Sequence, residues 1–208
     1  MDFILKVLMR KISTTYRSEL IRSMEYLAKD KKTIFLGQSV IYSGNAIYNT
    51  LQTIKNSRKI EMPVFEEVQM GLSIGMAMNG FIPVSCYPRF DFLILAMNQL
   101  FNHLDKMQFM SKGQFKPRVI IRTSIGSKKP LNGGVQHTQN YTKVFKSIST
   151  ELDVLLLNKN TRSPLELQLG PKTTLVSQAG ISNQKLSLQV IYTDNLKRQH
   201  RLSGKFFN

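Results

Sequence analysis

Cysteine and acidic residues are scarce in this chain. One Cys among 208 residues excludes an intramolecular disulfide and a zinc site built from cysteines. No apolar run approaches the ~18 residues that a transmembrane helix needs. The apolar run at residues 3–9 is interrupted by Lys6 and has no small-residue cleavage site, so we expect a cytoplasmic protein without a secretory signal. A basic presequence over residues 1–12 is the alternative.

Motifs for several common activities are also missing. The sequence has no Ser nucleophile elbow, no P-loop and no dinucleotide-binding fingerprint. It lacks a Gly-Asp-Gly element followed by a paired-Asn segment. Zinc-finger spacing and RNP-like aromatic strings are absent as well, so no motif supports nucleic-acid recognition.

Positive charge is in large excess. Lys and Arg number 29 against 13 Asp and Glu, which gives a formal net charge of +16. From Lys106 to Thr150 there are nine Lys or Arg and no acidic residue. A solvated basic face is the simplest interpretation. A site for a phosphorylated ligand, an acidic partner or nucleic acid is the alternative.

Apolar, β-rich runs alternate with segments of helical period. The runs expected to be strands are residues 33–37, 58–64, 82–87, 118–123 and 153–157. The segments expected to be helices are residues 20–28, 66–79, 92–110 and 142–148. Strands that alternate with helices predict an α/β fold with a parallel sheet covered by helices on both faces.

The C-terminal quarter carries a weaker pattern. Residues 158–208 are rich in Asn, Gln, Ser, Thr and Lys, and they contain eight Lys or Arg but only two acids, Glu166 and Asp194. Residues 186–192 are a candidate for one more strand. The stretch 195–208 is basic and has no clear period, so we expect low order there.

Two glutamates, Glu66 and Glu67, follow a predicted strand end and open a predicted helix. Ligands of open α/β sheets bind beyond the carboxyl ends of the strands, so a carboxylate at this place is a candidate for chemistry. Favourable pairing with the helix dipole, worth ~0.3–1 kcal/mol, explains the same residues without a ligand. Gly71 and Gly75 lie four residues apart in this helix, and the nearly bare face that they leave predicts close approach of another chain.

A second candidate is His137, in a glycine-rich loop that follows a predicted strand. Histidine is the usual general acid or base near neutral pH, although a lone loop histidine is more often a surface residue. A third candidate is the set Asn98, Asn102 and Lys106, which the spacing places on one face of the long helix. The polar side of an amphipathic helix explains the same pattern.

Several segments, in order along the chain, resemble one family. The first two segments are residues 15–20 and residues 33–40. The third is residues 63–66, followed by Gly71, Gly75, Ala77, Gly80 and Pro83. The fourth contains the pairs Asp91-Phe92, Asn98-Gln99, Asn102-His103 and Lys106-Met107 with residues 110–114, and the fifth contains residues 120–126 with residues 133–139. Together they make residues 14–157 similar to the pyrimidine-binding domain of thiamine-diphosphate enzymes in the transketolase superfamily. The resemblance is strongest to the beta subunit of the decarboxylating component of 2-oxo acid dehydrogenases, such as pyruvate or branched-chain dehydrogenase.

The resemblance implies roles for individual residues. Glu66 matches the glutamate that hydrogen-bonds the cofactor's aminopyrimidine and favours the tautomer whose nitrogen acts as an internal base. Glu67 should then point elsewhere. His137 matches a histidine beside the reacting thiazolium and the substrate. Arg89 stands where an aromatic residue commonly packs near the pyrimidine, so Phe65 or Phe90 would replace that stacking contact.

The resemblance also implies a cofactor and a partner. Thiamine diphosphate would be shared with an alpha-like subunit that holds the diphosphate and magnesium, because the Gly-Asp-Gly element is missing here. The substrate would be a small 2-oxo acid or a sugar phosphate, and the assembly a hetero- or homo-oligomer. The alternatives are a truncated, non-catalytic paralogue that acts as an interaction module, and a basic nucleic-acid-binding protein.

The expected organisation has three parts. Residues 1–13 form an N-terminal extension, and residues 14–157 form the pyrimidine-binding domain. Residues 158–208 form a basic polar segment that does not resemble the C-terminal domain of the family, so we expect that domain to be absent.

Overall fold

The computed structural model describes residues 16–126 and 132–157, together with three further strands at residues 174–179, 190–193 and 199–202. The predicted extension at residues 1–13 lies outside the described residues.

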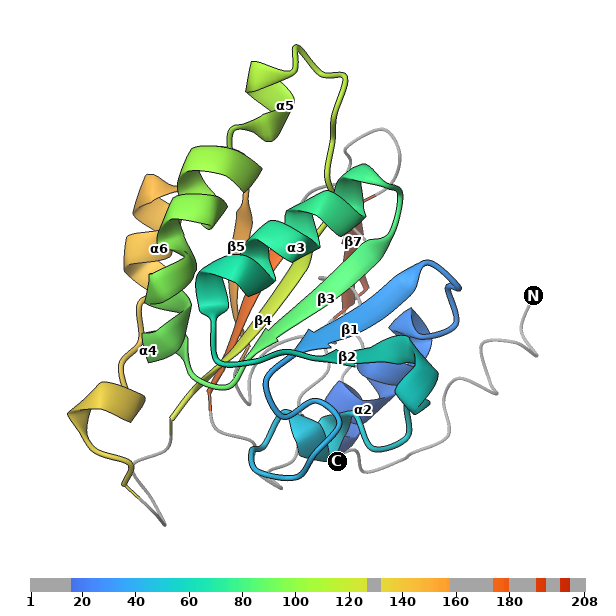
Figure 1. The fold of residues 1–208 in the computed structure, drawn as a ribbon, viewed down its shortest axis with the longest axis vertical. Helices are drawn as coiled ribbons and strands as arrows, with labels where there is room; N and C mark the ends of the chain where they lie inside the picture. Colours follow the sequence, from blue (N-terminus) through green and yellow to red (C-terminus); the bar gives the residue numbers. More distant parts are fainter. Residues whose placement is uncertain (1–15, 127–131, 158–173, 180–189, 194–198, 203–208) are drawn as a thin grey trace.

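A parallel sheet of six strands forms the centre, in the order β2-β1-β3-β4-β6-β5 (Figure 1). Its strands are β1 (Thr33–Gly37), β2 (Lys59–Glu61), β3 (Ile82–Tyr87), β4 (Ile120–Ile125), β5 (Asp153–Leu157) and β6 (Thr174–Ala179). The longer helices are α2 (Tyr16–Leu27), α3 (Glu66–Met78) and α6 (Thr142–Ile148). Short 3₁₀ turns are η1 (Tyr48–Thr50), η2 (Asn56–Arg58) and η5 (Val135–His137). The predicted α/β class with a parallel sheet is confirmed.

Neighbouring residues of the central strands point to opposite sides and build two cores. Cys86 and Ile120 belong to a core with α2, whereas Tyr87 and Ile121 belong to a core with α3 and α6. Burial on both sides explains why these strand runs are apolar throughout. Burial also raises the pKa of the Cys86 thiol to about 11, which makes the lone cysteine a packing group and not a nucleophile.

The helix predicted over residues 92–110 is interrupted. It consists of α4 (Phe90–Leu93), a 3₁₀ turn η3 (Ile94–Ala96), a π-helical segment η4 (Asn98–Leu104) and α5 (Met107–Met110). The wide turn is visible in the bond from the Asp105 N–H to the Leu100 carbonyl at 2.9 Å. The segment still buries one apolar side, because Leu93, Leu100 and Leu104 are all buried.

Strand β2 is shorter than predicted. The sequence pattern extends it over residues 58–64, but the ladder with β1 ends at Glu61. Pro63 has no N–H for a ladder bond, and its carbonyl accepts the Phe65 N–H at 2.8 Å in a tight turn. This turn brings the chain directly into α3.

Strand β6 was not expected from the sequence. Its six residues include Thr174, Ser177 and Gln178, so the run lacks the apolar character of the other strands. The strand pairs with β4 on one side and β5 on the other, and the segment assigned to the polar C-terminal part therefore contributes to the central sheet.

A separate antiparallel pair follows β6 along the chain. β7 (Val190–Thr193) overlaps the candidate strand at residues 186–192, whose first residues lie outside the described part. β8 (Gln199–Leu202) pairs with β7 inside the stretch where we expected low order. The rest of residues 195–208 lies outside the described residues. Across the described ranges, no helix is long and apolar enough to cross a membrane.

Candidate functional site at the carboxyl edge of the sheet

Parallel pairing brings the carboxyl ends of β1, β2, β3 and β4 to one edge of the sheet (Figure 1). Gln38 follows β1, Glu61 ends β2, and Arg89 follows β3. The helix α3 begins at this edge with Glu66. This is where open α/β sheets bind ligands, so these polar side chains define the candidate site.

Glu66 is a buried carboxylate in the first turn of α3. Its exposed fraction is 3%, and its Oε1 accepts a hydrogen bond from Gln38 Nε2 at 2.9 Å. The helix dipole favours a negative charge at this position. Among the described residues, Oε1 is the only oxygen of this carboxylate that receives a hydrogen bond, which leaves Oε2 available to a ligand.

Tyr87 supports the same helix start from the adjoining strand. Its hydroxyl donates to the backbone carbonyl of Glu66 at 3.4 Å. Burial, reinforced by the nearby Glu66 charge, raises the pKa of the Tyr87 phenol well above its usual value. The phenol therefore stays protonated and remains a donor.

Gly37 allows β1 and β3 to approach closely just before Gln38. Its φ is +149°, and a Cβ at this position would lie 2.1 Å from the Cys86 carbonyl oxygen. Any other residue would push the strand ends apart. The close approach thus fixes where the Gln38 side chain starts.

Glu61 binds the loop that follows β1. Its carboxylate accepts the backbone N–H groups of Ser39, Val40 at 3.0 Å and Ile41 at 2.8 Å. Ser39 has a left-handed φ of 53°, which turns successive amides toward the carboxylate. Neither Glu61 nor Gln38 is among the site residues predicted from the sequence. The available signal was their position as polar residues at the ends of adjacent strands.

Glu67 points away from Glu66, as expected. Its Oε1 accepts a hydrogen bond from Asn98 Nδ2 at 3.2 Å, and Asn98 Oδ1 accepts one from Asn102 Nδ2 at 2.9 Å. The predicted polar row on the long helix is therefore partly right. Lys106 lies outside it, because its Nζ binds Asp105 Oδ2 and Thr150 Oγ1 at 2.7 and 2.8 Å.

His137 lies in η5, a tight turn held against α4. Its ring packs edge-on against Phe92 with 5.4 Å between the centroids. Gly126 makes room for the turn, because a Cβ there would lie 1.8 Å from the His137 carbonyl oxygen. The ring Nδ1 is buried and has no hydrogen-bond partner in the part of the chain that the structure describes. Because Nδ1 is closed off from solvent, a substrate would have to meet the exposed part of this half-buried ring, and a histidine in such a place is suited to proton transfer or to orienting a substrate.

The three residues expected to contact the cofactor ring differ in position. Phe65 is 55% exposed beside Glu66. Phe90 has an exposed fraction of 0% and packs edge-on against Tyr141 and Phe145, so it offers no face to a ligand. Arg89 Nη1 donates to the Pro88 carbonyl at 3.1 Å and to a side chain of β4, which ties the two strand ends together.

An apolar stripe on α3 adjoins Glu66. Phe65, Val68 and Leu72 are exposed along one side of the helix, and Gly75 continues this side, where an added Cβ would meet no atom within 4 Å. Gly71 differs, because the Gln99 side chain lies 3.9 Å from its Cβ position. Of the two glycines expected to leave a bare face, only Gly75 is open. We refer to Phe65, Val68, Leu72 and Gly75 as the α3 stripe.

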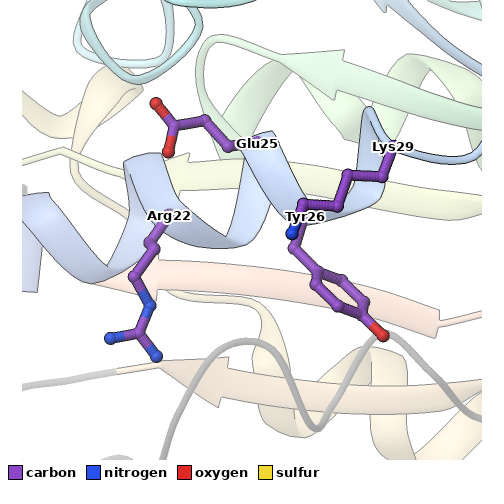
Figure 2. Close-up of a pocket in the computed structure, with 4 residues that line it drawn as sticks. All are labelled: Arg22, Glu25, Tyr26 and Lys29. Carbon is purple, nitrogen blue, oxygen red and sulfur yellow. The ribbon is translucent and has the colours of Figure 1, made fainter. Parts of the chain in front are cut away.

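A shallow pocket also lies on α2, lined by Arg22, Glu25, Tyr26 and Lys29 (Figure 2). Lys29 Nζ lies 5.6 Å from the Tyr26 ring centroid, and Arg22 pairs with Glu19 at 3.1 Å. Arg22, Tyr26 and Lys29 thus already have partners along this segment, and α2 packs on the opposite face of the sheet from α3. No cluster of His, Cys, Asp and Glu suited to a metal ion occurs within the described ranges.

Comparison with known proteins shows what the chain is similar to. No protein-family model matches the chain. The pyruvate dehydrogenase E1 component subunit beta of Rickettsia conorii is 30% identical over 138 residues, which make up 64% of this chain and 42% of that protein. The structure of a split-gene transketolase, an inactive beta4 tetramer, covers 83% of this chain and 53% of its own with a TM-score of 0.57 and 15% identity.

A second solved structure shares the fold. It is a protein isolated from Mycobacterium smegmatis and assigned to the thiamin diphosphate-dependent enzymes, with a TM-score of 0.52 and 9% identity over 84% of this chain and 32% of its own. The resemblance seen in the sequence is thereby confirmed. The chain spans between about a third and two fifths of the length of the curated relatives that it matches.

Proposed function

We propose that this relative of the pyruvate dehydrogenase E1 beta subunits is the pyrimidine-binding half of a two-chain, thiamine-diphosphate-dependent enzyme. The proposal rests on the burial and hydrogen bonding of the Glu66 carboxylate. Its carboxylate is buried at the carboxyl edge of the sheet, with Oε1 held by Gln38 and Oε2 available. The substrate class is a 2-oxo acid or a sugar phosphate, as in the families that the chain resembles.

The residues present fit the aminopyrimidine of this cofactor. A ring nitrogen can bond Glu66 Oε2, because that oxygen has no other partner among the described residues. Phe65, exposed beside it, supplies an apolar surface for the ring. When bound, thiamine diphosphate supplies the nucleophilic thiazolium carbon that no protein side chain can replace.

The chain itself would hold and move protons at two places. Glu66 would accept a hydrogen bond from the ring nitrogen and thereby favour the tautomer that takes up the thiazolium proton. Its burial strengthens that bond, because water does not compete for the carboxylate. His137, whose ring is half-buried, would bind or protonate the substrate. We assign the diphosphate to a partner, because the Gly-Asp-Gly element is missing from this sequence.

The α3 stripe is the surface where we place this partner. It is apolar, begins at Phe65 next to Glu66, and includes the open position Gly75. An alpha-like subunit seated here would cover Glu66 and exclude water from the cofactor. The related split-gene transketolase, solved as an inactive beta4 tetramer, is consistent with a beta-like chain that is inactive alone.

Two experiments test the proposed function. Co-purification followed by mass spectrometry should identify a partner that carries the Gly-Asp-Gly and paired-Asn elements. With this partner, thiamine diphosphate and magnesium present, exchange of the thiazolium proton should fall by about 10²–10⁴ in Glu66→Gln. Glu67→Gln is the matched control, and it should exchange at nearly the wild-type rate because Glu67 faces Asn98. Equal exchange in both variants and in wild type would leave the interaction-module function in place of catalysis.

A further inference from the structure

A series of hydrogen bonds connects the end of β2 to the Glu66 carboxylate. Glu61 accepts three successive amides of the loop at residues 39–41, and Gln38, which precedes this loop, donates its Nε2–H to Glu66 Oε1. From this arrangement we infer that Gln38 is a positioning residue for Glu66, and that Glu61 fixes Gln38 in the required place. The inference rests on the proposed function of Glu66.

Gln38 orders the Glu66 side chain at the start of α3. A glutamate side chain has several rotatable bonds, and ordering it for a ligand costs conformational entropy. The bond from Gln38 selects one orientation before any cofactor binds. Because the donor is a neutral amide, it orders the carboxylate without neutralising its charge. It also occupies Oε1, so that only Oε2 is left to meet the pyrimidine.

The position of Gln38 is itself held from three directions. Gly37 fixes the backbone before it by its contact with the Cys86 carbonyl. Asn45 Nδ2 donates to the Gln38 carbonyl at 3.3 Å. On the far side, Glu61 binds the amides that follow, and hydrogen bonds to a charged acceptor are the strong ones. These contacts hold the backbone at Gln38 in one position, which fixes where its side chain starts.

A purely structural bond between the β1 loop and α3 is the competing explanation. The two explanations differ in what happens when Glu66 is already lost. If Gln38 acts through Glu66, its removal matters only while the Glu66 carboxylate is present. If it merely holds the loop to the helix, its removal has the same effect with or without the carboxylate. A double-mutant cycle separates these cases.

The first measurement uses the full chain alone, without cofactor. In ¹H–¹⁵N spectra, the side-chain amide of Gln38, assigned by its loss in Gln38→Leu, should shift in Glu66→Gln and not in Glu67→Gln. Gln52→Leu is the matched control, because Gln52 is exposed, and it should leave these signals unchanged. A Gln38 amide signal that does not respond to Glu66→Gln would overturn the inference whatever the cofactor does.

The second measurement follows thiazolium proton exchange in the chain assembled with its co-purified partner, thiamine diphosphate and magnesium. Gln38→Leu should slow exchange about 10-fold or more, with cofactor affinity changed by less than about 3-fold. In the Glu66→Gln background, Gln38→Leu should add no further loss. An equal loss in both backgrounds would show that Gln38 acts independently of Glu66 and would overturn the inference.

The two proposals fail in different ways. If Glu66→Gln exchanges at the wild-type rate, the proposed function of Glu66 is wrong and the positioning role falls with it. If Glu66→Gln is slow but Gln38→Leu is not, the function stands and the positioning role alone is wrong.

Discussion

The buried carboxylate of Asp105 binds Thr150 across 45 residues of sequence, with Oδ2 accepting the hydroxyl at 2.6 Å. The same carboxylate accepts the backbone N–H groups of Thr150, Glu151 and Leu152 at 2.8–3.1 Å. Asp105 follows the π-helical segment η4, and these amides lead into β5. One side chain therefore joins the interrupted helix to the strand at the edge of the sheet.

We predict that Asp105→Asn destabilises the fold. The amide keeps the shape but removes the charge that the three backbone donors and Lys106 Nζ bind. Hydrogen bonds to charged groups contribute ~1.5–3 kcal/mol, so the free energy of unfolding should fall by about 2 kcal/mol or more. Urea denaturation measures this. Asp153→Asn, at an exposed residue of β5, is the control and should change little. Equal stability of both variants would contradict the role of Asp105.

The contribution of Asp105 should also depend on pH. Burial alone would raise the pKa of this carboxyl, but hydrogen bonds from Lys106, Thr150 and Glu151 lower it from 3.8 to about 2. A carboxyl whose folded pKa lies below its unfolded pKa stabilises the fold above pH ~4, and this stability is lost as pH falls from ~4 to ~2. The stability difference between wild type and Asp105→Asn should therefore shrink over this range. A constant difference down to pH 2 would show that the pKa is not lowered.

Gly75→Leu should weaken association through the α3 stripe. The position is open, and Leu is a better helix former than Gly, so the fold should be retained. The added side chain would hold a partner away from the helix. Sedimentation velocity of the chain, alone and with its co-purified partner, measures the effect. Val144→Lys, at an exposed position of α6, is the control for an unrelated surface. Unchanged association of Gly75→Leu would exclude this stripe as the interface.

Gly37→Ala should disturb the fold at the site. The new Cβ would lie 2.1 Å from the Cys86 carbonyl oxygen, in a backbone conformation that L-residues rarely adopt. Strain of this kind costs of order 1–3 kcal/mol, and the steric overlap adds to it. Chemical denaturation should show the loss. Gly75→Ala is the matched control, and it should be neutral or up to ~1 kcal/mol more stable because nothing surrounds its Cβ position.

His137→Gln should separate two proton transfers. The half-buried ring lies against Phe92 in a different loop from Glu66. In the assembled enzyme we expect thiazolium exchange near the wild-type rate and substrate turnover lowered by about 10²–10⁴. Slow exchange in this variant would place His137 in the activation of the cofactor instead.

Local pattern was enough to predict much of the molecule. The strands β1, β3 and β5 and the helices α3 and α6 agree with apolar runs of the expected period. The different directions of the Glu66 and Glu67 side chains are consistent with the 100° step between neighbouring helical residues. These features depend on residues close together in sequence, which is why the sequence alone reveals them.

Other features depend on contacts between distant residues. Gln38 and Glu66 are 28 residues apart, and nothing in either local pattern indicates their bond. Phe90 looked available beside Arg89, but its ring completes a cluster with residues of α6 and the preceding loop. The π-helical segment η4 buries Leu100 and Leu104, and strand β6 is paired on both of its edges. None of these contacts can be predicted from the local sequence pattern alone.

The insertion of β6 between β4 and β5 has a consequence for how the sheet is completed. β5 pairs with β6 and not with β4, although it precedes β6 in the chain. During synthesis β5 leaves the ribosome before β6, so its pairing in this sheet cannot form until residues 174–179 have been made. The strands β2, β1, β3 and β4 can pair before that point. The last strand of this sheet to be synthesised is therefore an interior strand and not an edge strand.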